Sequence, residues 1–219
     1  AESVLEKITS KTRLIILNSP ANPTGGVVPY NELKKLALGL EKFPNVFILS
    51  DEIYSRILFD KNKHTSLLSF PEIKDRVIVL DGWSKTYSMT GWRLGYGIFP
   101  KRIFKFAEKL AINCHSCISV PTQIAGIEAL EGSQIAVDEM ICEFQKRRNF
   151  LVNALNSIKN ISCIKPGGAF YVFPKIIKNN EKSKDISTHL LEKKFIATVP
   201  GSSFGENGEG FLRMSYASK

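Results

Sequence analysis

The side chains best suited to chemistry lie in three short segments of the chain. The first is Asn22-Pro-Thr-Gly25, the second is Asp51-Glu-Ile-Tyr54, and the third contains Lys85. A lysine amine can form an imine with an aldehyde, a carboxylate can keep a pyridine nitrogen protonated, and cationic or hydroxyl donors can bind a phosphate. Together these groups predict a site for pyridoxal phosphate.

The order and spacing of the three segments resemble the aspartate aminotransferase family, the class I and II aminotransferases. The resemblance covers nearly the whole chain, as far as residues 211–217. It implies an α/β protein of the fold-type-I class of transferases that depend on pyridoxal phosphate. Members of this family are considerably longer, so we expect a C-terminal portion that lacks the family's phosphate-binding loop and the aromatic ring that stacks on the cofactor.

Composition and charge restrict the classes of partner. The chain has 219 residues, is 43% hydrophobic and carries a formal charge of +9. Its lysines are scattered, which argues against a nucleic-acid surface. No apolar run approaches the roughly 20 residues that a membrane-spanning helix needs. We therefore expect neither a nucleic-acid nor a membrane partner.

The four cysteines carry little functional signal. Only Cys114-His-Ser-Cys117 has a spacing that metal or redox chemistry uses, and a zinc site would need further ligands nearby. We interpret this run as the small-residue start of a buried helix and expect no metal site. Free thiols are typical of a reducing compartment, so we expect a cytoplasmic protein.

Apolar patterns predict strands that alternate with helices in the first half of the chain. The predicted strands are residues 14–17, 46–49, 77–80 and 94–99; a helix near 33–40 follows the first strand, and a helical stretch covers about 101–130. Asn22, Asp51 and Lys85 each follow a predicted strand by a few residues. Because α/β sheets bind ligands at strand ends, we expect these residues to line a crevice.

Shorter segments predict a second, smaller α+β domain. A long helix is expected over about 135–158, with core candidates Val137, Ile141, Phe144, Phe150, Leu151 and Leu155. Strands near 161–164, 170–173, 196–199 and 212–215 and a helix near 186–193 follow. We assign residues 1–132 to part of the large cofactor-binding domain and 133–219 to the small C-terminal domain, and we expect the family's last helix to be missing.

The resemblance assigns roles to the first group of side chains. Lys85 is implied to form the Schiff base with the cofactor and then to shuttle a proton at the substrate α-carbon, although a lysine after a strand is ordinarily only a solvated charge. Asp51 is implied to contact the pyridinium nitrogen; alternatively, it caps a helix that begins at Glu52. Tyr54 is implied to donate to the phenolic oxygen of the cofactor.

The remaining candidates bind the phosphate and the substrate. Ser84 and Arg93 are implied for the phosphate, whereas Gly82 stands where many relatives have a phosphate-binding serine. Asn22 is implied to contact both the phenolic oxygen and the substrate carboxylate, although its segment is also a typical turn. Arg213 is implied to bind the substrate α-carboxylate; an internal salt bridge is the alternative.

The sequence therefore predicts an aminotransferase that moves an amino group between an amino acid and a 2-oxo acid, with pyridoxal phosphate as cofactor and a homodimer as the assembly. This function belongs to amino acid metabolism and biosynthesis. Two alternatives stay open: a lyase or synthase on the same scaffold, and a non-catalytic fragment that packs against a partner. We expect the truncated chain by itself to be inactive.

Overall fold

A computed structural model describes residues 1–176 and 181–218 of the chain. The chain divides into two compact units. The first unit comprises Ala1–Pro20, Val28–Arg56 and Lys63–Val137, and the second comprises Ala21–Val27, Ile57–Asn62 and Asp138–Lys219. Two short segments from the N-terminal half thus belong to the second unit, which the sequence patterns do not indicate.

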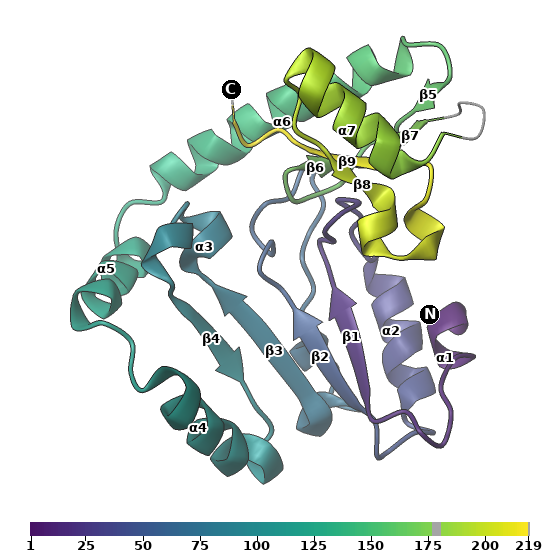
Figure 1. The fold of residues 1–219 in the computed structure, drawn as a ribbon. Coiled ribbons are helices and arrows are strands. Elements are labelled where there is room, and N and C mark those ends of the chain that lie inside the picture. Colours follow the sequence, from purple (N-terminus) through teal and green to yellow (C-terminus); the bar gives the residue numbers. More distant parts are fainter. Residues whose placement is uncertain (177–180, 219) are drawn as a thin grey trace. The chain divides into compact units, whose positions relative to one another are not determined.

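A four-stranded sheet forms the centre of the first unit (Figure 1). Its strands are β1 (Leu14–Asn18), β2 (Phe47–Asp51), β3 (Val77–Gly82) and β4 (Gly95–Ile98), in that spatial order. The first three strands are parallel and β4 is antiparallel to β3. Asn18 pairs with Asp51, and Asp51 pairs with Leu80, so the carboxyl ends of the three parallel strands lie level.

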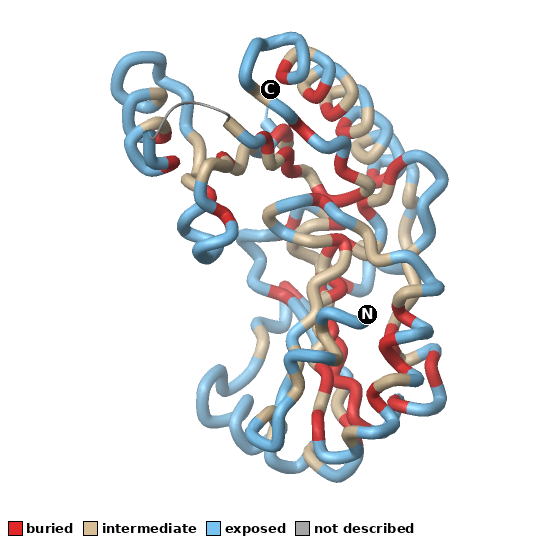
Figure 2. The backbone as a smooth tube through the Cα atoms, turned by 90° about the vertical axis from the view of Figure 1, so that its right-hand side faces the viewer, coloured by how far each residue is buried: buried red, intermediate tan, exposed pale blue. Residues whose placement is uncertain are grey.

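The core of the first unit lies between the sheet and helix α2 (Tyr30–Leu40). This helix begins after Pro29 and buries Leu33, Leu36, Ala37 and Leu40, the spacing that the sequence predicts for its apolar face. These side chains pack with Ile48, Val77 and Val79 of the strands, and Figure 2 shows the buried stretches in red. Burying each large aliphatic side chain contributes about 1.5–3 kcal/mol.

The predicted helical stretch over 101–130 is interrupted. It forms two helices, α4 (Lys101–His115) and α5 (Val120–Glu131). Ser116 has a positive φ of 59° at the end of α4, and Pro121, which has no N–H, lies in the first turn of α5. The prediction that Cys114-His-Ser-Cys117 starts a buried helix is wrong, because this run ends α4 and both cysteines are exposed.

Short elements connect the larger ones in the first unit. They are α1 (Glu2–Leu5), α3 (Trp83–Thr86), and the 3₁₀ turns η1 (Leu67–Ser69), η2 (Lys74–Arg76) and η3 (Thr90–Trp92). Helix α3 begins directly after β3, which places the segment that contains Lys85 at the carboxyl end of the sheet.

The second unit combines two helices with short strands. Its elements are α6 (Ile135–Asn156), whose first three residues belong to the first unit, β5 (Ile161–Ser162), β6 (Tyr171–Val172), β7 (Lys175–Ile176), α7 (Ser183–Lys194), β8 (Val199–Pro200), η4 (Gly201–Phe204), η5 (Glu206–Gly208) and β9 (Leu212–Ser215). The strands form an antiparallel sheet in the order β6-β9-β8 and a separate β5-β7 pair. Of the strand expected near 196–199, only residue 199 is in β8.

Helix α6 buries a face that differs in part from the expected one. Phe144 and Leu155 are buried as predicted, but Phe150 is 76% exposed, so its prediction as a core residue is wrong. The buried positions between them are Arg148 and Val152. They continue the helical spacing of three to four residues from Phe144 to Leu155, whereas Phe150 lies off that stripe.

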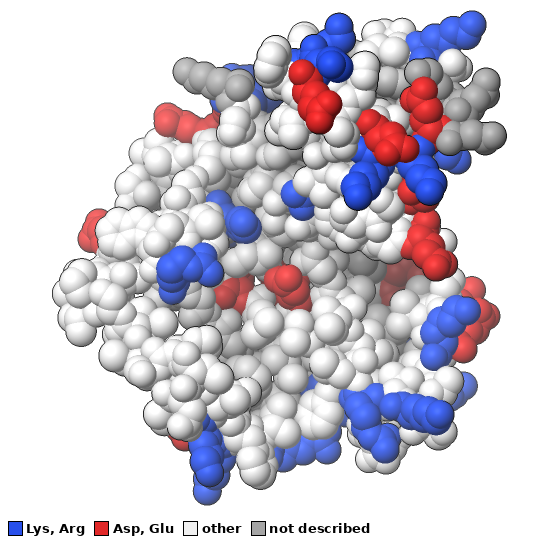
Figure 3. Space-filling model, in the orientation of Figure 1, with Lys and Arg blue, Asp and Glu red and all other residues white. Residues whose placement is uncertain are grey.

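In the part of the chain that the structure describes, no helix combines the length and apolarity needed to cross a membrane. Figure 3 shows lysine and arginine side chains in separate small groups on the face in view, with acidic side chains among them.

Candidate active site

Asp51 and Lys85 lie at the ends of neighbouring parallel strands in the first unit. Asp51 is the last residue of β2, and Lys85 is in α3, directly after β3. Burial raises the pKa of the half-buried Asp51 carboxyl; the Ile53 N–H and the charge of Lys85 lower it, and the charge of Glu52 raises it further. An amine and a carboxylate therefore interact electrostatically at the carboxyl end of the sheet.

The backbone around Asp51 is held by hydrogen bonds from two directions. Its carbonyl accepts from the Ser19 amide at 3.3 Å and from Asn18 Nδ2 at 3.0 Å. Its Oδ1 accepts from the amide of Ile53 at 3.2 Å. The alternative in which Asp51 caps a helix is wrong, because the residues that follow form turns. Tyr54 lies in these turns and is buried.

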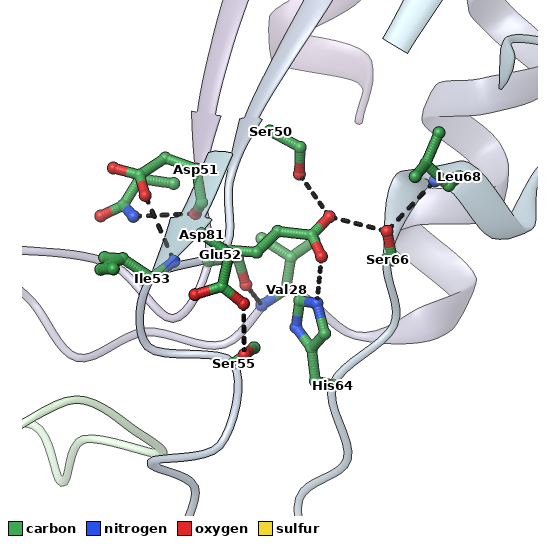
Figure 4. Close-up of polar contacts among 12 residues, drawn as sticks. Val28, Ser50, Asp51, Glu52, Ile53, Ser55, His64, Ser66, Leu68 and Asp81 are labelled. Carbon is green, nitrogen blue, oxygen red and sulfur yellow. Dashed lines mark hydrogen bonds and ion pairs between the residues drawn. The ribbon is translucent and has the colours of Figure 1, made fainter. Parts of the chain in front are cut away.

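No sequence pattern indicates the buried carboxylate that directly follows Asp51. Glu52 accepts hydrogen bonds from Ser50 Oγ and Ser66 Oγ, each at 2.9 Å, and its Oε2 lies 2.8 Å from His64 Nε2 (Figure 4). Burial raises the pKa of Glu52, but the contacts with His64, Ser66 and Ser50 outweigh it, so the net pKa is lowered. The group ties the turn after β2 to the segment before η1.

A second carboxylate at the strand ends is Asp81. It accepts from the amide of Gly82 at 2.6 Å and from Ser55 Oγ at 3.2 Å. Burial raises its pKa, and these two hydrogen bonds oppose the rise. Asp81 and Ser55 also line a cavity of about 130 Å³. No sequence pattern indicates this role, because an aspartate at a strand end is common.

The backbone of the neighbouring strand explains why a glycine occupies position 82. A Cβ atom at this position would lie 2.8 Å from the Cα of Gly95 and 2.9 Å from the carbonyl oxygen of Leu94. Both of these are backbone atoms and cannot move aside cheaply. The absence of a serine at Gly82 therefore fits the close approach of β3 and β4 in this chain.

The two phosphate candidates are connected through Thr90. Its Oγ1 donates to the carbonyl oxygen of Ser84 at 2.9 Å, and its own carbonyl accepts from Arg93 Nη1 at 2.8 Å. Arg93 is exposed and has a positive φ of 57°. The turn around η3 thus brings Ser84 and Arg93 into one hydrogen-bonded segment beside Lys85.

The two substrate candidates meet in the second unit. Arg213 Nη1 donates to Asn22 Oδ1 at 2.9 Å, and the Asn22–Pro23 peptide bond is cis. Gly25, the last residue of the same motif, has a φ of 67°, and a Cβ there would lie 2.7 Å from the carbonyl oxygen of Gly168. This position therefore requires glycine, and the turn fixes the segment that carries Asn22.

Arg213 has no acidic partner among residues 1–176 and 181–218, so the alternative of an internal salt bridge does not hold there. Its guanidinium carbon lies 4.7 Å from the centre of the Tyr171 ring and 5.2 Å from that of the Phe204 ring. A half-buried cation without a carboxylate is suited to bind an anion.

The fold matches solved aminotransferases. An aspartate aminotransferase from Rhizobium meliloti has a TM-score of 0.93 and 35% identity, with 100% of this chain and 57% of that chain covered. An aromatic aminotransferase from Pyrococcus horikoshii has a TM-score of 0.94 and 36% identity, with coverage of 100% and 58%. The fold is therefore the fold-type-I class of pyridoxal-phosphate-dependent transferases.

The family follows from the sequence comparison. The model of the family "Aminotransferase class I and II" matches residues 1–219, and the chain belongs to this family. A probable aspartate aminotransferase from Methanocaldococcus jannaschii is 42% identical over 100% of this chain and 57% of its own length. A probable aspartate/prephenate aminotransferase from Rickettsia felis is 40% identical over 99% and 55%. The chain spans little more than half the length of these relatives.

Proposed function

We propose that the protein containing this chain is an aminotransferase that uses pyridoxal phosphate to move an amino group between an amino acid and a 2-oxo acid. The observation that carries the proposal is the placement of Asp51 and Lys85 at the ends of adjacent parallel strands, where their charges interact. The names of the similar proteins support an aminotransferase in preference to a lyase or synthase.

The chemistry of the donor set fits the cofactor. Lys85 supplies an amine, Asp51 a carboxylate for the pyridine nitrogen, and Tyr54 a hydroxyl for the phenolic oxygen. Ser84 and Arg93, connected through Thr90, supply donors for a phosphate. When bound, pyridoxal phosphate supplies an aldehyde that captures amines and a protonated ring that withdraws electrons from the substrate α-carbon.

Each residue then has a definite task. Lys85 would hold the cofactor through its amine and would accept the proton from the substrate α-carbon. Asp51 keeps the pyridine nitrogen protonated, and the N–H of Ile53 and the charge of Lys85 favour its ionised form against burial. Asn22 and Arg213, hydrogen-bonded to each other, bind the α-carboxylate that both substrates share.

The assembly and the compartment are part of the proposal. We infer a homodimer from the family and a role in amino acid metabolism from the reaction class. A cytoplasmic location is consistent with the free thiols of Cys114, Cys117, Cys142 and Cys163.

Two measurements test the function in the natural protein. Borohydride reduction of the protein with pyridoxal phosphate should fix the cofactor on a peptide that contains Lys85, and Lys85→Ala should abolish this label. An amino acid alone should bleach the visible cofactor band, and a 2-oxo acid should restore it. A label on another lysine, or release of ammonia with the band unchanged, contradicts the proposal.

A further inference from the structure

The guanidinium of Arg213 is constrained by three contacts in the second unit. Its Cζ lies over the rings of Tyr171 and Phe204, at 4.7 and 5.2 Å, and Nη1 donates to Asn22 at 2.9 Å. An aromatic ring attracts a guanidinium that lies with its flat face against the ring, whereas the N–H donors point outward in the guanidinium plane. The two rings can therefore orient the plane without occupying its hydrogen-bonding edge.

Tyr171 reaches Arg213 through strand pairing. Tyr171 in β6 pairs with Ser215 in β9, and Arg213 lies two residues before Ser215 on the same strand. Residues two apart lie on the same face of a strand, so Tyr171 and Arg213 are diagonal neighbours on one face of the sheet. Tyr171 is buried, with 7% of its surface exposed, which leaves its ring little freedom to move away.

Phe204 is held from a different direction. It lies in η4, where its ring meets the Phe173 ring edge-on at 6.0 Å, and Phe173 in turn stacks on Phe211 at 4.9 Å. The amide of Gly201 donates to the carbonyl of Phe211 at 2.8 Å, which closes the loop that carries Phe204. This loop thus places the Phe204 ring, which is 39% exposed, beside the arginine.

We propose that Tyr171 and Phe204 are positioning residues that hold the Arg213 guanidinium in the orientation that receives the substrate α-carboxylate. The inference rests on the proposed function, because it takes the carboxylate of the amino acid and the 2-oxo acid as the anion. An arginine fixed in advance loses less conformational freedom on binding, so removal of one ring weakens carboxylate binding without affecting the attachment of the cofactor to Lys85.

The test uses Phe204→Leu, which keeps an apolar side chain but removes the ring. In the natural protein loaded with pyridoxal phosphate, KM for the amino acid and KM for the 2-oxo acid should each rise about tenfold, with a smaller change in kcat. Phe204→Tyr should retain the wild-type KM values. Phe195→Leu is the matched control, because Phe195 is 88% exposed in the same unit.

A binding measurement separates this inference from the proposed function. Calorimetry with propionate, a carboxylate that cannot donate an amino group, should give a dissociation constant about tenfold weaker for Phe204→Leu at an unchanged melting temperature. If turnover is absent but propionate affinity depends on Phe204, the positioning role stands and the proposed function fails. If turnover is present and Phe204→Leu changes neither KM nor propionate affinity, the positioning role is wrong. The positioning role is also overturned if Phe204→Leu lowers the melting temperature and Phe204→Tyr loses as much propionate affinity as Phe204→Leu.

Discussion

At the scale of single residues, two adjacent carboxyl groups have opposite pKa shifts. The pKa of Asp51 is raised, chiefly by burial, whereas three side-chain contacts lower the pKa of Glu52 despite burial. The negative charge of Glu52 also raises the pKa of its neighbour Asp51. Glu52 thus both braces the turn that follows β2 and affects the charge of the candidate cofactor ligand.

Removal of the Glu52 carboxylate should destabilise the protein. In Glu52→Ala, the hydroxyls of Ser50 and Ser66 and the ring of His64 lose their shared acceptor, which should lower the free energy of unfolding by about 1–3 kcal/mol. Urea unfolding followed by circular dichroism measures this change. Glu72 is exposed, so Glu72→Ala should change stability by less than about 0.5 kcal/mol. Equal losses in the two variants would contradict the bracing role.

The same carboxylate predicts a pH dependence. The folded-state pKa of Glu52 lies below the ordinary value of 4.5. The carboxylate therefore makes its full contribution to the free energy of unfolding above pH 4.5, and this contribution is lost as the pH falls through the folded-state pKa. The stability difference between wild type and Glu52→Gln should therefore shrink below pH 4.5. Urea melts at a series of pH values between neutral and acidic test this, and a difference that grows on acidification rules it out.

At the scale of elements, an ion pair joins α6 to the segment Ile57–Asn62. The fully buried Arg148 donates to Asp60 Oδ2 at 2.6 Å and to Oδ1 at 2.9 Å, and its guanidinium lies over the ring of Phe59. Asp60 is partly exposed, and Arg148 followed by Lys165 lowers its pKa to about 2. This bidentate contact holds a distant segment on the second unit.

Breaking one side of this pair should cost more than removing both sides. Asp60→Ala leaves the Arg148 cation buried without its carboxylate, and we expect a loss of about 1–3 kcal/mol, below the full cost of a completely buried pair because Asp60 is partly exposed. Arg148→Met added to Asp60→Ala should recover part of this loss. Denaturant melts of the single and double variants measure the coupling, and strictly additive losses would show that the pair is not coupled.

Sequence patterns predicted elements well where one periodicity dominates. The strands of the main sheet and the apolar face of α2 follow from runs such as Leu14 to Leu17 and from the spacing of Leu33 to Leu40. The patterns failed where local geometry decides, as at the break after Ser116. They also failed at Phe150, because a helix with apolar residues on several sides does not reveal its buried stripe, least of all when that stripe contains Arg148.

Some residues of the candidate site could likewise be predicted from the sequence and others could not. Lys85, Asp51 and Arg213 were found because their surroundings match a known family. Their standing as site residues remains a prediction. Glu52 and His64 were missed because an irregular backbone separates them, so that no spacing rule connects the two side chains.

At the scale of the whole molecule, α4 presents an unusual surface. It is amphipathic, yet none of its residues is buried, and Phe106 and Leu110 are 75% and 64% exposed. The adjacent α5 exposes Val120, Ile124, Ile127 and Leu130. Exposed apolar surface on this scale favours association.

The polypeptide 1–219 expressed by itself should therefore self-associate and bind a hydrophobic dye. Replacing Phe106 and Leu110 with glutamine should reduce both effects several-fold, as measured by analytical ultracentrifugation and dye fluorescence. Lys105 and Lys109 are exposed on the same helix, so the double change of these residues to glutamine is the control and should have little effect. A monomer at micromolar concentration that binds no dye would refute this prediction.

The path of the chain between its units has a consequence for how the protein can be divided and made. Because Ala21–Val27 and Ile57–Asn62 belong to the second unit, a gene fragment that encodes only residues 138–219 would omit Asn22 and Asp60. Arg213 would then lose its hydrogen bond to Asn22, and Arg148 would lose its ion pair with Asp60. During synthesis on the ribosome, these two segments emerge long before the helix and strands that receive them. The second unit can therefore be completed only after residues 138–219 have been translated, and it cannot be exchanged between relatives as one contiguous cassette.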